Sequence, residues 1–113
     1  MITNDGKADI ATSYILAKYT TIKIGDGADS TSASQTKLDH LVTTKLGQSP
    51  TVVGSTIIWN VDFLGSEIPS SGISEIGIFH VSSDKLLTRI TFTSTGVVAA
   101  SDTVTFTIRI GVN

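Results

Sequence analysis

The segment from Gly25 to Ser34 holds the first residues whose types could do chemistry. Gly25-Asp26-Gly27 is glycine-rich, as phosphate-binding loops are, but the third glycine and the Lys-Ser/Thr pair of such loops are missing. Asp26, Asp29 and Ser30 carry oxygens that suit a calcium ion, yet no bidentate Glu closes the loop. We therefore expect a solvated turn after a strand and predict neither a phosphate site nor a metal site here.

The other candidate groups for catalysis are isolated from one another in the sequence. His40 and His80 have no neighbouring Cys, no second His and no Glu-X-X-His pairing, which metal binding needs. No Ser lies in a Gly-X-Ser-X-Gly elbow, and the Asp and Glu residues are few and dispersed. We assign no catalytic, cofactor-binding or metal-ligating residue, expect no cofactor, and predict that the chain is not an enzyme.

Two further side chains stand out because of the strands that carry them. Glu75 is a charge inside an apolar strand, and we expect it to point to solvent on the outer face of a sheet. The alternatives are an ion pair with Arg89 on the neighbouring strand or with a partner subunit. Trp59 is expected in the core, with an interface anchor as the alternative.

These residues must be positioned mainly by strands. Apolar residues fall on every second position of the last segment, which predicts a strand with one buried face: Val104, Phe106, Ile108 and Ile110. The same reasoning predicts strands over 20–24, 51–53, 56–63, 73–81, 85–92 and 103–112. The segment 38–46 suits a helical turn or a strand, and 51–63 suits a strand pair or one strand with a bulge at Gly54.

One helix is expected, over residues 5–17, with Asn4 or Asp5 as its cap. Its apolar face is predicted from spacings of three and four to be Ala8, Ile10, Ala11, Tyr14, Ile15 and Ala17. Together the elements predict a mainly β fold, a small antiparallel β-sandwich with a short N-terminal helix, formed by one domain spanning 1–113 with strands from about residue 19 onward. The expected core residues are Trp59, Ile76, Ile78, Ile90, Phe92, Phe106 and Ile108.

Composition narrows the possible partners. The chain has 113 residues, no Cys and a net charge of −2, and its six Lys and two Arg are scattered singly. A basic patch for phosphate neutralisation cannot be built from them, so we expect no nucleic-acid binding. Its apolar runs are far shorter than the ~20 residues that span a bilayer, and its N-terminus lacks the basic and apolar regions of a secretory signal, so we expect no membrane association and folding in a cytoplasm.

Four stretches together form a recognisable pattern: the helix start at Thr3 to Lys7, the strand and turn at Tyr19 to Gly27, the Glu-Ile-Gly-Ile-Phe strand within Ser74 to Phe79, and the paired strands Leu86 to Phe92 and Ser101 to Ile110. In this order they resemble the N-terminal domain of bacteriophage tail-fibre and tail-collar proteins and related small virion structural proteins. Thr88 departs from the small residue that usually precedes the Arg, and the chain stops at Asn113 where a tail fibre continues into a shaft and tip.

The resemblance implies a virion structural protein, assembled in the host cytoplasm, that docks onto other capsid or tail proteins. A capsid decoration (cement) subunit and a tail or baseplate adaptor are both implied, and host recognition is not. A homo-oligomer is expected, with a homotrimer suggested by analogy with threefold sites. The alternative is a carbohydrate- or ligand-binding β-sandwich module in which Tyr14, Tyr19 or Trp59 stacks on a sugar.

Overall fold

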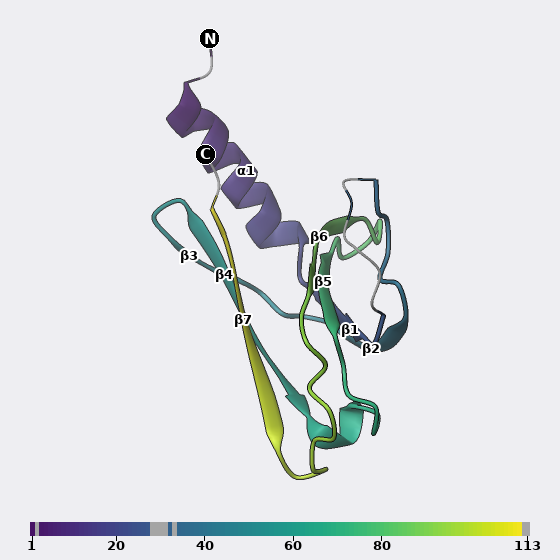
Figure 1. The fold of residues 1–113 in the computed structure, drawn as a ribbon. Helices are drawn as coiled ribbons and strands as arrows, with labels where there is room; N and C mark the ends of the chain where they lie inside the picture. The colour runs from purple at the N-terminus through teal and green to yellow at the C-terminus, as the bar shows by residue number, and fades with distance from the viewer. Residues whose placement is uncertain (2, 28–31, 33, 112–113) are drawn as a thin grey trace.

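The protein consists of two antiparallel sheets that pack face to face, with a helix at the N-terminus (Figure 1). The computed structural model describes residues 1, 3–27, 32 and 34–111. Its elements are α1 (Asn4–Lys18), β1 (Thr21–Gly25), β2 (Leu41–Lys45), β3 (Thr51–Val53), β4 (Thr56–Leu64), the 3-10 turn η1 (Gly65–Glu67), β5 (Glu75–Phe79), β6 (Leu86–Thr91) and β7 (Thr103–Gly111). One sheet has the order β2-β1-β5-β6 and the other β3-β4-β7, which confirms the mainly β sandwich with a short N-terminal helix.

The core lies between the two sheets and follows the alternation of β4. Its four inward residues are almost fully buried: Ile57, Trp59, Val61 and Phe63. They face the inward residues of the other sheet, which come from β1 and β5: Ile22, Ile24, Ile76 and Ile78. A strand places successive side chains on opposite faces, and a shift of one residue would turn these apolar side chains to the solvent. Burial of one face of each sheet therefore fixes how the strands pair.

Three of the seven expected core residues are less buried than predicted. Phe92 and Phe106 are half-buried against the core, and Ile90 is 42% exposed. Ile90 pairs with Ile76, but β6 is the last strand of its sheet, as β7 is of the other. A side chain on an edge strand has a neighbouring strand on one side only, and the sequence period does not reveal which strands form the edges.

The two segments that the sequence left open are strands. Residues 41–45 form β2, which pairs with β1, so the helical-turn alternative for 38–46 is wrong. Residues 51–64 form a strand pair, with Val53 opposite Thr56 across a two-residue turn. Gly54 has φ 62° there, a conformation that glycine adopts without steric cost and that mirror-image hairpin turns require.

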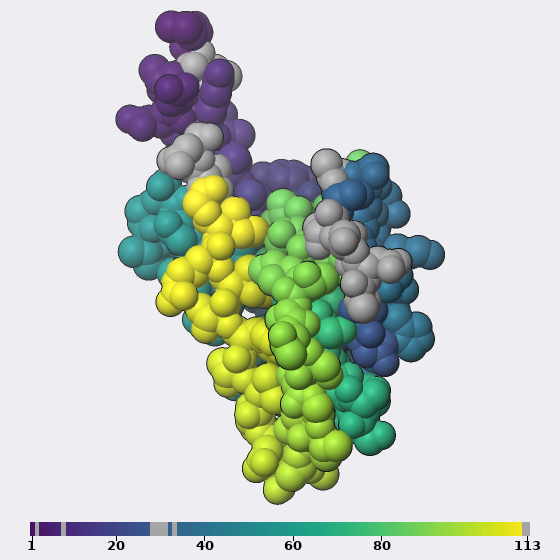
Figure 2. All heavy atoms as spheres, viewed as in Figure 1, coloured from purple at the N-terminus to yellow at the C-terminus, as the bar shows by residue number. Residues whose placement is uncertain are grey.

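The helix begins one residue earlier than predicted and projects beyond the sheets. Thr3, not Asn4 or Asp5, caps it, because its Oγ1 accepts a hydrogen bond from the Gly6 N–H (3.1 Å). Ile15 packs against the core, whereas Ile10 and Tyr14 are 62% and 51% exposed. Figures 1 and 2 show the reason for Ile10, since the first turns of α1 extend past the end of the sandwich. The Ala8 side chain lies outside the described part of the structure.

Of the helices described, none has the length and apolar character needed to cross a membrane.

Candidate functional site

Glu75, the first residue of β5, is completely buried and forms an ion pair with Arg89 of β6. The Arg89 Nε donates to Glu75 Oε1 at 2.7 Å, and both side chains have zero exposure. The register places Arg89 opposite Gly77, two residues from Glu75 on the same face of the sheet. The expectation that Glu75 points to solvent is therefore wrong, and the alternative of a pair with Arg89 is confirmed.

The other hydrogen bonds to this carboxylate come from the backbone of the segment between β1 and β2. The N–H of Gly27 donates to Oε2 at 2.9 Å, that of His40 to Oε2 at 2.8 Å, and that of Asp39 to Oε1 at 2.9 Å. Each carboxylate oxygen thus accepts two hydrogen bonds, which uses its available lone pairs. We call this group, formed by Gly27, Asp39, His40, Glu75 and Arg89, the Glu75 clamp.

The clamp holds Glu75 in its charged form. Burial by itself disfavours the charged carboxylate and raises its pKa, but the hydrogen bonds from the His40 N–H, from Arg89, and from the Asp39 and Gly27 N–H groups outweigh burial. The net result is that the pKa of Glu75 is lowered from its ordinary value of 4.5. The carboxylate is therefore a buried anion that holds both ends of the 27–40 segment against the sheet.

The glycines of Gly25-Asp26-Gly27 let the carboxylate approach the backbone closely. A Cβ on Gly25 would lie 2.2 Å from the His40 carbonyl oxygen and 2.5 Å from Glu75 Oε2, and one on Gly27 would lie 2.6 Å from the same Oε2. Real Cβ atoms do not come this close to other heavy atoms. Gly25 is the last residue of β1 and both glycines are buried, so the expected solvated turn is wrong for these residues. The two glycines accommodate a carboxylate of the chain itself.

His40 and Asp26 form an exposed contact at the rim of the clamp. His40 Nδ1 is hydrogen-bonded to Asp26 Oδ1, and the Asp26 N–H donates to the His40 carbonyl oxygen at 3.1 Å. The hydrogen bond to Asp26 raises the pKa of His40, and the Asp26 charge raises it further. This contact fastens the two ends of the segment again, outside the buried ion pair.

The Glu75 carboxylate of the clamp is not available for catalysis or metal binding. It is inaccessible and already accepts four hydrogen bonds, so it cannot act as a base or a ligand without unfolding locally. Within the residues that the structure describes, no three His, Asp or Glu side chains gather to hold a metal ion. Asp29 and Ser30, which the sequence suggested for calcium, lie outside the described residues.

His80 is 8% exposed and lies in a separate cluster with two tyrosines. Its Nδ1 accepts hydrogen bonds from the backbone N–H groups of Ser82 and Ser83, both at 3.1 Å, so its proton resides on Nε2. That Nε2 lies 3.0 Å from the Tyr14 hydroxyl, and the Tyr19 ring packs edge-on to the imidazole at 5.3 Å. The cluster attaches the end of α1 to the turn after β5.

Trp59 is 1% exposed and its Nε1 donates to the Tyr19 carbonyl oxygen at 2.9 Å. The core prediction for Trp59 is confirmed, and the residue is not available as an interface anchor or as a platform for a sugar ring. The rings of Tyr14 and Tyr19 make an edge-to-face contact, with an interplanar angle of 66° and ring centroids 6.2 Å apart.

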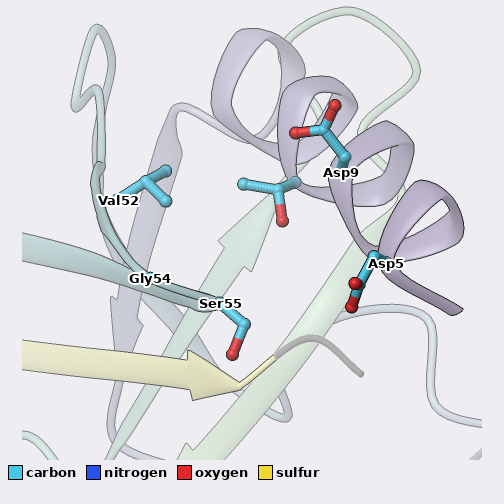
Figure 3. A pocket seen from close by; sticks show the side chains of 6 residues that line it. Asp5, Asp9, Val52, Gly54 and Ser55 are labelled. Carbon is cyan, nitrogen blue, oxygen red and sulfur yellow. The ribbon is translucent and has the colours of Figure 1, made fainter.

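A shallow hollow separates α1 from the β3–β4 hairpin. It is lined by Asp5, Asp9, Thr12, Val52, Gly54 and Ser55. Figure 3 shows that the Asp5 and Asp9 carboxylates lie apart on successive turns of the helix and do not converge on one point. An acidic hollow of this kind is an ordinary feature of the first turns of a helix, where carboxylates favour the positive end of the dipole.

Comparison with protein-family models finds no match, and no curated protein is similar enough to assign a family. The likeness to phage tail-fibre N-terminal domains therefore remains an inference from the residues quoted above.

Sequence reasoning missed the three backbone donors of the clamp. The available signal was a pair of patterns, namely a Glu in an otherwise apolar strand followed by an Arg in the next strand, and a Gly-X-Gly turn upstream. A buried charge needs a partner and additional hydrogen bonds, so an apolar strand that carries Glu predicts such donors somewhere in the chain. The strand order determines which loop supplies these donors. β1 lies beside β5, so the segment that follows β1 reaches the Glu75 carboxylate.

Proposed function

We propose that the chain is a bacteriophage virion structural protein that docks onto other capsid or tail proteins. Its place is that of a capsid decoration (cement) subunit or of a tail or baseplate adaptor. It acts within the virion after assembly in the host cytoplasm, as a homo-oligomer, for which a homotrimer is the form suggested by analogy.

The observation that supports this proposal most is that residues carrying the family resemblance contact one another in the clamp. Gly27 belongs to the strand-and-turn motif, Glu75 to the Glu-Ile-Gly-Ile-Phe motif, and Arg89 to the following strand motif, and the three are bonded to one another through the Glu75 carboxylate. Motifs that are distant in sequence and jointly build one buried contact are characteristic of a shared fold, which supports reading them together as a family pattern.

The surface chemistry also supports a role in assembly. The outward residues of β4 and β7 form a polar ladder in which Thr105 Oγ1 donates to Asp62 Oδ1 at 2.6 Å and Thr107 Oγ1 donates to Asn60 Oδ1 at 2.8 Å. These outward side chains are exposed and offer hydroxyl, amide and carboxylate groups that can form hydrogen bonds with another protein.

The test is quantitative mass spectrometry of purified particles of the phage that encodes this chain. The proposal expects the chain in the particles after density-gradient purification, in a fixed ratio to the major capsid protein. Tens to hundreds of copies per particle assign it to the capsid surface, and a few copies assign it to the tail or baseplate. Its absence from particles, when it is present in the infected-cell lysate, rejects the proposal.

A further inference from the structure

We propose that the free edge of β7 pairs with β7 of a second copy, antiparallel about a twofold axis at Thr107, to form a continuous six-stranded sheet. This extends the proposed function by naming a surface through which copies meet, and it specifies a dimer contact in place of the threefold arrangement taken from analogy. The partner that covers the free edge of β7 is a second copy of this chain.

The first argument is that β7 differs from the other three edge strands. Proteins protect edge strands by shortness, irregular register, charged side chains (above all Lys), Pro or inward-pointing charges. β3 has three residues. β2 carries Lys45 and pairs with β1 through an irregular register, and β6 carries the buried Arg89 and also pairs irregularly.

β7, in contrast, has a single protection of this kind, the charge of Arg109. It runs for nine residues in unbroken register with β4, without Pro or Lys. Across the part of the chain that the structure describes, its backbone hydrogen bonds go to β4, so the opposite edge presents its N–H and C=O groups outward. Figure 2 shows β7, in yellow, at the near surface of the molecule over most of its length. A second strand satisfies such a row of donors and acceptors.

The second argument is that the side chains complement themselves about Thr107, the central residue of β7. Antiparallel pairing there covers the whole strand and places Phe106 opposite Ile108 of the second copy and Val104 opposite Ile110 of the second copy. Phe106, Val104 and Ile110 are half-buried in the single chain. The pairing therefore covers apolar surface that the edge position of β7 leaves partly open.

The charges on the outer face also match. The same register places Arg109 opposite Thr105 of the second copy, whose hydroxyl donates to the carboxylate of Asp62 on the adjacent strand. Each guanidinium thus faces a region of opposite charge, and the twofold axis repeats the contact. At the axis itself the neutral Thr107 meets its own copy, so no like charges oppose each other.

The experiment uses single cysteines in the full chain, which has none of its own. Directly opposed residues of antiparallel strands lie about 4.5–5.5 Å apart at Cα, within the range that a disulfide spans. Thr107→Cys places two thiols at the axis, whereas the matched control Thr105→Cys places each thiol opposite Arg109. Both variants replace an exposed Thr on the same face of β7, and each removes one hydrogen bond to β4.

The proposal expects the unmodified chain to form a concentration-dependent dimer in light scattering. Under mild oxidation Thr107→Cys becomes a covalent dimer at least roughly tenfold faster than Thr105→Cys, and Arg109→Glu weakens the dimer of the cysteine-free chain by roughly tenfold. Equal cross-linking rates, a monomer at high concentration, or an oligomer that Arg109→Glu leaves unchanged would each overturn it. Melting curves establish that the variants are folded. The outcome is independent of whether the chain is found in virions, so the two proposals fail separately.

Discussion

Replacing Arg89 with Met tests whether the Glu75 clamp determines the stability of this fold. The substitution keeps an apolar stem of similar length and removes the guanidinium that donates to Glu75 at 2.7 Å. The Glu75 carboxylate then stays buried with three backbone N–H groups as its remaining donors in the clamp.

The expected cost follows from the burial of both partners. Breaking a fully buried ion pair by removing one partner costs about 3–5 kcal/mol, because it leaves an uncompensated charge. The three N–H groups still compensate the Glu75 charge in part, so we expect a loss near the lower limit, about 3 kcal/mol. Native domains have about 5–15 kcal/mol in total, so the variant should fold but unfold at a much lower urea concentration.

Urea unfolding monitored by fluorescence measures this loss directly, since Trp59 is the only tryptophan and is 1% exposed. Arg109→Met is the matched control, because Arg109 is the other arginine and lies exposed on β7. At concentrations that keep the chain monomeric, it should change the free energy of unfolding by no more than about 0.5 kcal/mol. If Arg89→Met were also within 1 kcal/mol of the parent chain, the clamp would not be a major source of stability and the reasoning would be refuted.

Four further predictions concern the same structure. Gly27→Ala should lower the free energy of unfolding by about 1–3 kcal/mol through overpacking against Glu75, while Gly111→Ala, whose Cβ meets nothing within 4 Å, should be close to neutral in the same urea titration. The folded-state pKa of Glu75 lies below 4.5, so its contribution is fully present above pH 4.5 and is lost as the pH falls through that lowered pKa; an acid titration of stability without a decrease there would contradict the assignment. The pKa of His40 is raised above 6.5, so its smaller contribution is present below pH 6.5 and is lost as the pH rises through the folded-state pKa, which NMR titration of the imidazole measures. Phe106→Ala should cost about 2–3 kcal/mol, below the usual 3–5 for a buried Phe because the ring is half-buried, and an unchanged melting temperature would place the ring outside the core.

The period-two patterns predicted the strands well because burial of one face acts on every second residue. The alternation in β7 predicted one buried face, and that face is the more buried one in the structure: Val104, Phe106, Ile108 and Ile110. The same patterns failed at Ile90, since a period says which face a residue occupies and not whether another strand lies beside it.

The helix also shows that a sequence pattern predicts an apolar face but not how much of that face is buried. Spacings of three and four residues predicted a continuous apolar face, and Ile15 packs against the core as that face requires. Ile10 stays largely exposed because the first turns of the helix extend past the end of the sandwich. Helix length follows from local residues, whereas the extent of the surface beneath it follows from the packing of the sheets.

The sequence by itself determined the mainly β class and the inward face of β7, because both depend on local alternation. It left open whether 38–46 is a strand and whether 51–63 is one strand or two, and the structure decided both. Only the tertiary structure decided the role of Glu75. Its environment is made by Arg89 two positions from the opposing residue on β6, and by Gly27 and His40 at the two ends of a segment that β1 and β2 bring beside β5. A charge in an apolar strand has the same local pattern whether it faces water or donors, and the strand order determines which of the two it meets.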